Sequence, residues 1–254
     1  MARSAQTPIP AATVVVMRER EAAAPELLIV ERARDLAFAG GALVFPGGRI
    51  DPADRALAEA AGPAAPDDAE ARIAAIRETI EEAGIAVGFA RPMTGIDLKR
   101  VRAGLHEAVP LVRLLPMGAD SIAFDALVPF ARWCPEMAHA RIFDTRFYLA
   151  RLPDDAPEPV VDGTENVRAF WATARDVLDR ADRGDGHLIF PTRRNLERLA
   201  LFGSFAEAAE DAVAHPVRTI TPWIEQRADE QHLCIPEDRG YPVTSQPVSA
   251  AFRG

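Results

Sequence analysis

Residues 74–85, with the sequence AAIRETIEEAGI, constrain the fold of this chain more than any other stretch. At 100° per residue, one face of a helix would carry three carboxylates, those of Glu78, Glu81 and Glu82. The opposite face would carry Ile73, Ile76, Ile80 and Ala83. We therefore predict a helix over residues 68–83 that buries its isoleucines, points its acids away from the core and ends at Gly84.

The helix taken alone fits an ordinary solvated acidic face, but two features favour a metal site. Glu78 and Glu82 are like charges at i, i+4 and repel each other by a few tenths of a kcal/mol without a cation. The sequence FPGGRID, residues 45–51, precedes the helix, and paired glycines let a backbone approach a ligand closely. The Gly47 carbonyl is therefore a further candidate oxygen ligand. Carboxylate and carbonyl oxygens suit Mg²⁺ or Mn²⁺.

Composition excludes some partners. The 254 residues carry a formal net charge of −9, so neither a nucleic-acid polymer nor an anionic membrane is the expected partner. A small phosphorylated substrate remains compatible, because bound divalent cations reverse the local charge. Cys134 and Cys234 lie far apart without a CxxC pair, and we expect a reduced, cytoplasmic protein without a structural zinc site. The sequence leaves the oligomeric state open, a homodimer included.

The order of the elements predicts an α+β fold. Two strands are expected in residues 12–20 and 26–34, and two more in residues 125–133 and 141–152. Helices are expected in residues 98–115, after Thr173, after Thr192 and after Ser204. The proline-rich tail from Thr219 is expected to pack as extended chain. No linker or repeat divides the chain, so residues 1–254 are predicted to form one domain, with C-terminal helices and a tail from about residue 192.

The motif resembles the signature of the Nudix hydrolases. That signature is a glycine, a glutamate, Arg-Glu-x-x-Glu-Glu-x-Gly and an aliphatic residue. Gly48 matches its start, and the second half matches at Arg77, Glu78, Glu81, Glu82, Gly84 and Ile85. Two positions depart from it, because Asp54 stands at the first glutamate and Thr79 at an aliphatic position.

The spacing also departs from the signature. Gly48 and Arg77 are separated by 28 residues, more than the uninterrupted signature has. Residues 55–69 are the natural place for an inserted loop, which costs little stability. An interrupted signature of this kind is similar to that of the peroxisomal coenzyme A diphosphatases and their bacterial relatives. Stretches such as residues 27–48 and 162–178 resemble the same branch.

The resemblance implies an α/β/α sandwich with a mixed sheet, here with extra helices, and hydrolysis of a diphosphate in a small nucleoside-linked substrate. It implies Glu78 and Glu82 as ligands of Mg²⁺ or Mn²⁺, with Glu81 as a third ligand or a catalytic carboxylate. Arg77 would hold a carboxylate in position, and Glu165 is the candidate carboxylate outside the signature.

Three functional hypotheses stay open. Coenzyme A or an acyl derivative leads, ADP-ribose or another nucleotide conjugate comes second, and a non-catalytic Nudix-fold binding module is third. Arg32 and Arg34, beside the glycine-rich turn, could meet substrate phosphates, but a solvated pair is the simpler interpretation.

Overall fold

The computed structural model describes residues 7–36, 39–93, 95–135, 142–161, 163 and 165–251. Its helices are α1 (Pro52–Ala60), α2 (Ala69–Ala83), α3 (Gly95–His106), α4 (Leu111–Leu114), α5 (Ala174–Asp182), α6 (Phe190–Leu199), α7 (Phe205–Ala214) and α8 (Val248–Ala251). Its strands are β1 (Ile9–Arg20), β2 (Ala23–Arg32), β3 (Leu43–Val44), β4 (Gly47–Arg49), β5 (Val128–Trp133), β6 (Phe143–Arg151), β7 (Asn166–Thr173), β8 (Thr219–Ile220), β9 (Trp223–Arg227), β10 (Glu230–Cys234) and β11 (Ser245–Pro247).

An eight-stranded mixed sheet forms the centre of the molecule. Its strand order is β3-β2-β1-β6-β5-β8, with β4 paired to β1 and β7 paired to β2. β1 runs parallel to β6 along its length and antiparallel to β2 and β4. The start of β1 therefore holds the short glycine strand β4, which lies against α2.

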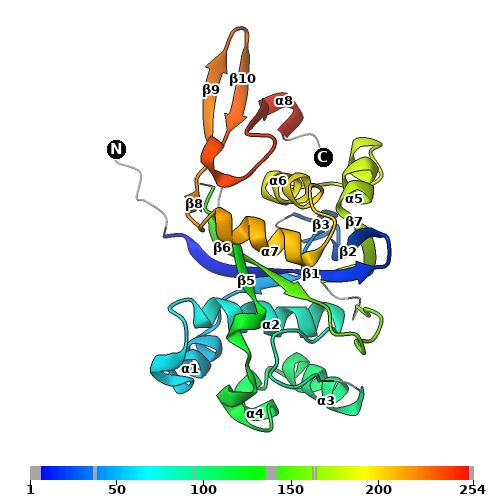
Figure 1. Ribbon diagram of the computed structural model, residues 1–254, viewed down its shortest axis with the longest axis vertical. Coiled ribbons are helices and arrows are strands. Elements are labelled where there is room, and N and C mark those ends of the chain that lie inside the picture. Colours follow the sequence, from blue (N-terminus) through cyan, green and yellow to red (C-terminus); the bar gives the residue numbers. More distant parts are fainter. Residues whose placement is uncertain are drawn as a thin grey trace.

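Two apolar layers cover the two faces of this sheet (Figure 1). Val14 and Val16 of β1 face the layer that contains α2, α3 and α4. Val15 and Met17 alternate to the other layer, which contains α5, α6 and α7. Because successive residues of a strand point to opposite faces, the continuous apolar run of β1 is buried on both sides. The predicted α+β class and the α/β/α sandwich with a mixed sheet are confirmed.

Helix α2 forms within one residue of the predicted range. Its isoleucines are fully buried against the sheet, and Gly84 ends it in the left-handed conformation at φ 64°. Asp68 precedes the first turn but does not cap it with its side chain. Instead, its carboxylate accepts hydrogen bonds from Arg72 and Tyr148.

The structure differs from the sequence prediction in residues 55–69, where a loop is expected. Residues 52–60 form helix α1, and a 3-10 turn follows at Gly62–Ala64. The α1 helix packs on α2 and buries Leu57 in the core, so this segment contributes to the fold rather than only extending its surface.

Helix boundaries differ elsewhere too. The stretch 98–115 divides into α3 and α4, and Pro110 directly precedes α4. Thr192 is not a cap, because α6 begins at Phe190 with Pro191 in its first turn. The expected caps at Thr173 and Ser204 are present, since each side chain accepts a backbone N–H three residues on.

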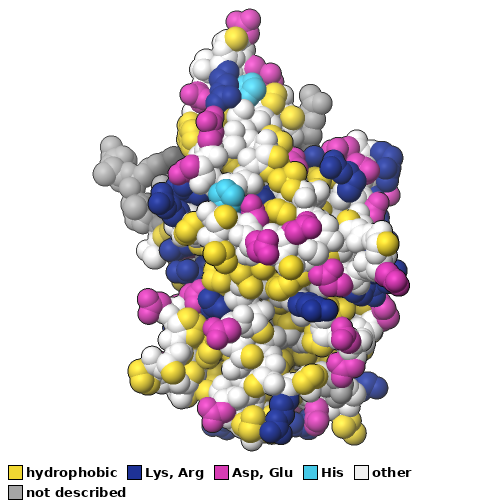
Figure 2. Space-filling model, in the orientation of Figure 1, with side chains coloured by type: hydrophobic (Ala, Val, Ile, Leu, Met, Phe, Trp, Pro, Cys, Tyr) yellow, Lys and Arg dark blue, Asp and Glu magenta, His cyan; other side chains and the backbone are white. Residues whose placement is uncertain are grey.

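The C-terminal tail is not plain extended chain. Strands β9 and β10 form a hairpin, and β11 pairs with β10 to complete a separate three-stranded sheet. Figure 1 shows this hairpin projecting from the end of the molecule, and Figure 2 shows that it is largely surface. Among the described residues, no helix has the length and apolar character needed to span a lipid bilayer.

Candidate active site

The glycine strand β4 lies close to α2 because its residues lack side chains. A Cβ on Gly48 would come within 2.2 Å of Glu78 Oε1. A Cβ on Gly47 would come within 2.4 Å of Thr13 Oγ1 and 2.5 Å of the Ala12 carbonyl oxygen. The two glycines therefore allow β4 to fit between β1 and the glutamates of α2.

The ladder between β1 and β4 decides which backbone groups face α2. Val14 N–H donates to the Pro46 carbonyl and Ile50 N–H to the Pro10 carbonyl. Because hydrogen-bonded and non-hydrogen-bonded pairs alternate in an antiparallel ladder, Gly47 and Arg49 direct their N–H and C=O groups away from β1.

Two side chains of α2 meet this outward edge. Glu82 Oε2 accepts from Gly47 N–H at 3.0 Å, and the Arg49 carbonyl accepts from Arg77 Nη2 at 2.9 Å. The Gly47 carbonyl lies on the same edge of the strand as its N–H, which places an oxygen donor beside the glutamates.

Arg77 is the central cation of the site. Its Nε and Nη2 donate to Asp54 Oδ1 and Oδ2, both at 3.0 Å. Its Nη1 reaches Glu78 Oε1 at 2.9 Å and Glu81 Oε2 at 3.3 Å. Burial by itself would lower the pKa of Arg77, but the hydrogen bonds to Asp54 and the neighbouring carboxylates raise it above its usual range.

The three glutamates of α2 are brought together on the face that carries Arg77. Burial raises the pKa of Glu78 to about 8, and the negative charges of Glu82 and Glu81 add to this shift, while Arg77 opposes it. Burial also raises the pKa of Glu82 to about 7, against the hydrogen bonds from Asn166 and the Gly47 N–H. The pKa of Glu81 is raised by burial as well. Removal from water thus makes each charged carboxylate costly in the absence of a cation.

Glu165 and Asn166 approach Glu82 from the start of β7. Asn166 is buried and donates a side-chain hydrogen bond to Glu82, while its own Oδ1 has no hydrogen-bond partner in the described structure. Glu165 is exposed, and its negative charge raises the pKa of Glu82. Glu165, the candidate carboxylate outside the signature, is therefore near α2, although Asn166 is the residue that hydrogen-bonds to Glu82.

Arg32 lies closer to the site than the sequence suggested. Its Nη1 is 3.9 Å from Glu82 Oε1, and its Nε is buried without a hydrogen-bond partner among the described residues. Arg34 is exposed, as expected of a solvated side chain. The expectation of a solvated pair is therefore wrong for Arg32.

Helix α3 supports the end of α2. Arg102 Nε and Nη2 donate to the Glu81 carbonyl at 3.1 and 3.0 Å, and His106 Nε2 is 3.2 Å from the same oxygen. Sequence reasoning identified neither these residues nor Asn166. No local pattern points to them, because they belong to elements that meet α2 only in the folded chain.

The donor set is compatible with a hard divalent cation. Its side-chain donors are carboxylate oxygens, and a backbone carbonyl lies at the adjoining strand edge. Within the described ranges, no three Asp, Glu, His or Cys side chains converge into a ready-made metal cage. Mg²⁺ does not need such a cage, because it usually keeps water and binds substrate phosphates alongside one or two carboxylates.

Comparisons with known proteins find relatives among the Nudix hydrolases. No protein-family model matches the sequence. A Caenorhabditis elegans protein named nudix hydrolase 7 is 26% identical over 203 residues, covering 76% of this chain, which spans only 64% of that relative. The acyl-coenzyme A diphosphatase NUDT19 of Gallus gallus is 25% identical, over 85% of this chain and 73% of its own length.

A solved structure has the same fold. The crystal structure of a Nudix hydrolase from Alicyclobacillus acidocaldarius aligns with a TM-score of 0.68 and 27% identity, covering 82% of this chain and 97% of that one. The resemblance predicted from the interrupted signature, including its likeness to the coenzyme A diphosphatases, is confirmed. The chain therefore resembles the Nudix hydrolases in both its sequence and its fold.

Proposed function

We propose that this protein is a divalent-cation-dependent pyrophosphohydrolase that cleaves the diphosphate of a nucleoside-linked small molecule. The observation that carries the proposal is the cluster of three glutamates on α2 next to the glycine strand, of which Glu82 is buried and Glu78 and Glu81 are partly buried. Glu78 and Glu82 have pKa values raised by burial. Glu82 accepts the Gly47 N–H, and Glu78 lies against Gly48 of the same strand. Removing these carboxylates from water costs free energy, and a helix face with no role beyond contact with solvent would not need to meet that cost.

Each residue has a task in this proposal. Glu78, Glu82 and Glu81, with the Gly47 carbonyl, would hold Mg²⁺ or Mn²⁺. The cation, when bound, neutralises charge on the phosphate oxygens and promotes ionisation of water. Arg77 orients Glu78 and Glu81 through Nη1 while Asp54 anchors its other side.

Two carboxylates are candidates for orienting or deprotonating the attacking water. Glu81 has the most exposed side chain of the three glutamates of α2, at 25%, and its pKa is raised, which suits a base. Glu165 is the second candidate, because it is solvent-exposed and near Glu82. Single Glu81→Gln and Glu165→Gln variants distinguish them, since loss of the base lowers kcat and removes the corresponding limb of the pH profile.

The leading substrate class is coenzyme A or an acyl derivative. Its support is the interrupted signature and the 25% identity to the chicken acyl-coenzyme A diphosphatase. The second candidate is ADP-ribose or another nucleotide conjugate, and the third is binding without catalysis. The intact glutamates on α2 count against the third.

A substrate panel tests the proposal. Coenzyme A, ADP-ribose and a diadenosine polyphosphate are incubated with the protein in EDTA and in Mg²⁺, and the products are separated by chromatography. We expect hydrolysis only with Mg²⁺, and cleavage of coenzyme A to 3′,5′-ADP and phosphopantetheine. We expect kcat/KM for coenzyme A to be at least about tenfold above the others, a difference of about 1.4 kcal/mol in transition-state binding. Faster cleavage of ADP-ribose would contradict the coenzyme A assignment but not diphosphate hydrolysis. Full activity in EDTA would contradict the requirement for a divalent cation.

A further inference from the structure

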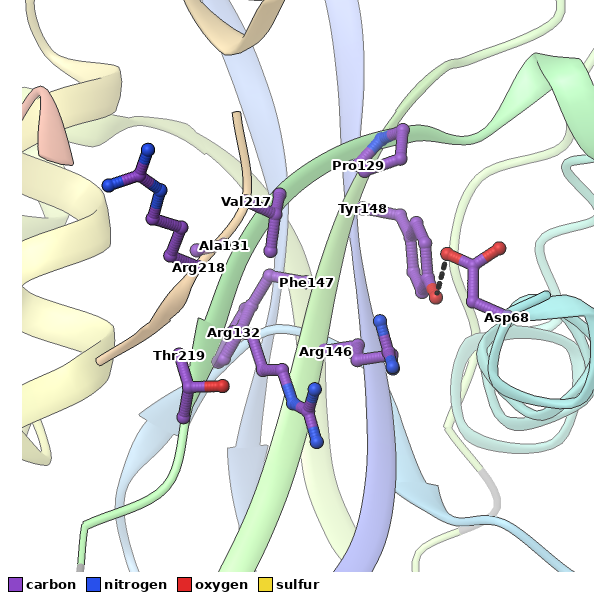
Figure 3. A pocket seen from close by; sticks show the side chains of 10 residues that line it. All are labelled: Asp68, Pro129, Ala131, Arg132, Arg146, Phe147, Tyr148, Val217, Arg218 and Thr219. Atoms are coloured by element: carbon purple, nitrogen blue, oxygen red, sulfur yellow. Dashed lines mark hydrogen bonds between the residues drawn. The ribbon is translucent and has the colours of Figure 1, made fainter. Parts of the chain in front are cut away.

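A second polar pocket lies away from the glutamates, at the edge of the sheet where β5, β6 and β8 meet. Its volume is about 260 Å³, and its wall includes Arg132, Arg146, Phe147, Val217 and Thr219 (Figure 3). Asp68, at the N-terminal end of α2, closes one side. Asp68 and Glu78 are ten positions apart, which is about 15 Å along a helix, so this pocket is distinct from the candidate metal centre.

The pocket exists because strand pairing stops early at this edge. β8 pairs only with Arg132 and Trp133 of β5. Earlier in β5 the register shifts between Pro129 and Ala131, and Pro129 has no N–H to offer a further strand. The chain before β8 therefore diverges from β5 and leaves a hollow lined partly by apolar side chains.

Two arginines face each other across the strands at this hollow. Arg132 of β5 and Arg146 of β6 are direct partners in the antiparallel ladder. Like charges in this position destabilise a sheet. Figure 3 shows the two guanidinium groups on the same side of the β5–β6 pair, whereas the Arg218 side chain points away from them. Figure 2 shows basic side chains gathered along the left edge of the molecule at the height of β8.

Among the described residues, a counter-charge is present for one of the two arginines. Arg132 makes a bidentate contact with Asp144, through Nε to Oδ1 at 2.8 Å and Nη2 to Oδ2 at 2.5 Å. Arg146 is half-buried and makes no hydrogen bond or ion pair in the described part of the chain.

Asp68, the acid that lines the pocket, already has hydrogen-bond partners. Asp68 Oδ1 accepts from Arg72 Nε at 2.7 Å, and Asp68 Oδ2 accepts from the Tyr148 hydroxyl at 2.9 Å. The Arg146 guanidinium, which has no counter-ion within the described ranges, thus lies next to a second guanidinium at a cavity in a protein whose net charge is −9. An anion in the cavity would offset the repulsion between the arginines.

We propose that this pocket binds a phosphate dianion, with Arg146 and Arg132 as its cationic donors and the Thr219 hydroxyl as a neutral one. Guanidinium groups match phosphate oxygens in geometry and charge. The cavity extends beyond the arginines along Phe147, Val217 and Pro129, which provides an apolar wall for an organic group attached to the phosphate. The site is independent of hydrolysis at the α2 glutamates.

Calorimetric titration of the full chain tests the proposal. The titrants are inorganic phosphate and glycerol 3-phosphate at constant ionic strength, in EDTA so that the acidic metal centre repels phosphate. We expect Arg146→Gln and Arg132→Gln each to weaken binding by at least about tenfold, because each removes a charge-assisted hydrogen bond. Arg146→Lys should retain part of the affinity, since it keeps the charge. Tighter binding of glycerol 3-phosphate than of phosphate identifies an organic monoester as the ligand, and equal binding identifies the free ion.

Arg151→Gln is the matched control, because Arg151 lies on the same strand β6, is exposed and is outside the pocket. Its affinity for phosphate should stay within about twofold of wild type, a difference of under 0.5 kcal/mol. Circular dichroism verifies that each variant is folded. The proposal is overturned if the wild type shows no binding at about 10 mM phosphate, or if folded Arg146→Gln and Arg132→Gln bind as tightly as wild type.

Discussion

Asp54 and Arg77 form a bidentate ion pair that joins the two parts of the signature on either side of the inserted segment. Both contacts are 3.0 Å, and Asp54 is 1% exposed. Asp54, which stands where the signature has a longer glutamate, contacts Nε and Nη2 of Arg77. Glu78 and Glu81 contact the remaining nitrogen, Nη1. Asp54 also accepts the backbone N–H of Asp51 at the start of α1, so one carboxylate connects the inserted helix to the candidate catalytic helix.

Breaking this pair should destabilise the protein. Asp54→Asn removes the charge that compensates Arg77, and loss of one partner of a buried pair costs roughly 3 to 5 kcal/mol. We expect the lower end of that range, because Glu78 and Glu81 still contact Arg77. Urea unfolding measures the change. Asp51→Asn is the control, since Asp51 is exposed and 3.7 Å from Arg77, and equal stability of the two variants would contradict the role of Asp54.

The glutamates of α2 should matter for turnover and not for folding. Glu78→Gln and Glu82→Gln should each lower kcat by about 10² or more, because each removes charge from the proposed cation site. Without metal, neither variant should melt below wild type, since the burial penalty of a carboxylate is removed. Glu70→Gln, on the same helix and paired with Arg55 at the surface, should keep full activity. An inactive variant that has also lost its melting transition would refute this account.

The pH dependence of stability should reveal the buried carboxylates. In the folded chain the pKa values of Glu78 and Glu82 are raised from 4.5 to about 8 and about 7. Between the unfolded pKa of 4.5 and the folded pKa of about 8, the folded state therefore binds more protons than the unfolded state. The free energy of unfolding falls as the pH rises through this range. The metal-free protein should lose stability between about pH 5 and pH 8, and Mg²⁺ should restore part of it at the upper end.

The double variant Glu78→Gln/Glu82→Gln isolates this contribution from other titrating groups. Its melting temperature in EDTA should vary less with pH than that of wild type. Parallel curves for the two proteins would show that these carboxylates do not carry raised pKa values.

The close approach of β4 to α2 makes Gly48 sensitive to substitution. Gly48→Ala places a methyl group within 2.2 Å of Glu78 Oε1, so the glutamate must move. We expect kcat to fall by at least about tenfold, since small misplacements of catalytic groups are costly. Gly203→Ala serves as the control, because a methyl group there meets Glu207 only at 3.5 Å. Unchanged kcat in Gly48→Ala would show that Glu78 need not hold its observed position.

The inserted helix should be needed for stability. Leu57 is 1% exposed and packs in the core shared with α2. Leu57→Ala should cost about 2 to 5 kcal/mol in urea unfolding, the usual range for a buried leucine. Replacement of residues 55–69 by a short linker, which a surface loop would tolerate, should likewise destabilise the chain. Wild-type stability of the linker variant would show that α1 is only an appendage.

The sequence alone determined the helix of the signature and the faces on which its side chains lie. A period of 3.6 residues puts the isoleucines and the glutamates of α2 on opposite faces, and Gly84 supplies the left-handed residue that ends it. The expected strands β1, β2, β5 and β6 also form, because alternating or continuous apolar runs are local signals.

The tertiary structure decided the rest, because it depends on contacts between segments far apart in the chain. Asn166 and Arg102 reach the site from β7 and α3, and no local pattern distinguishes them from surface residues. Arg32 of β2 was a candidate in the sequence, but only the folded chain places its guanidinium near Glu82 rather than in solvent. A loop was expected in residues 55–69, but Leu57 is buried in the core and residues 52–60 form helix α1. Likewise, Arg132 of β5 and Arg146 of β6 line the same pocket because strand pairing places them directly opposite each other.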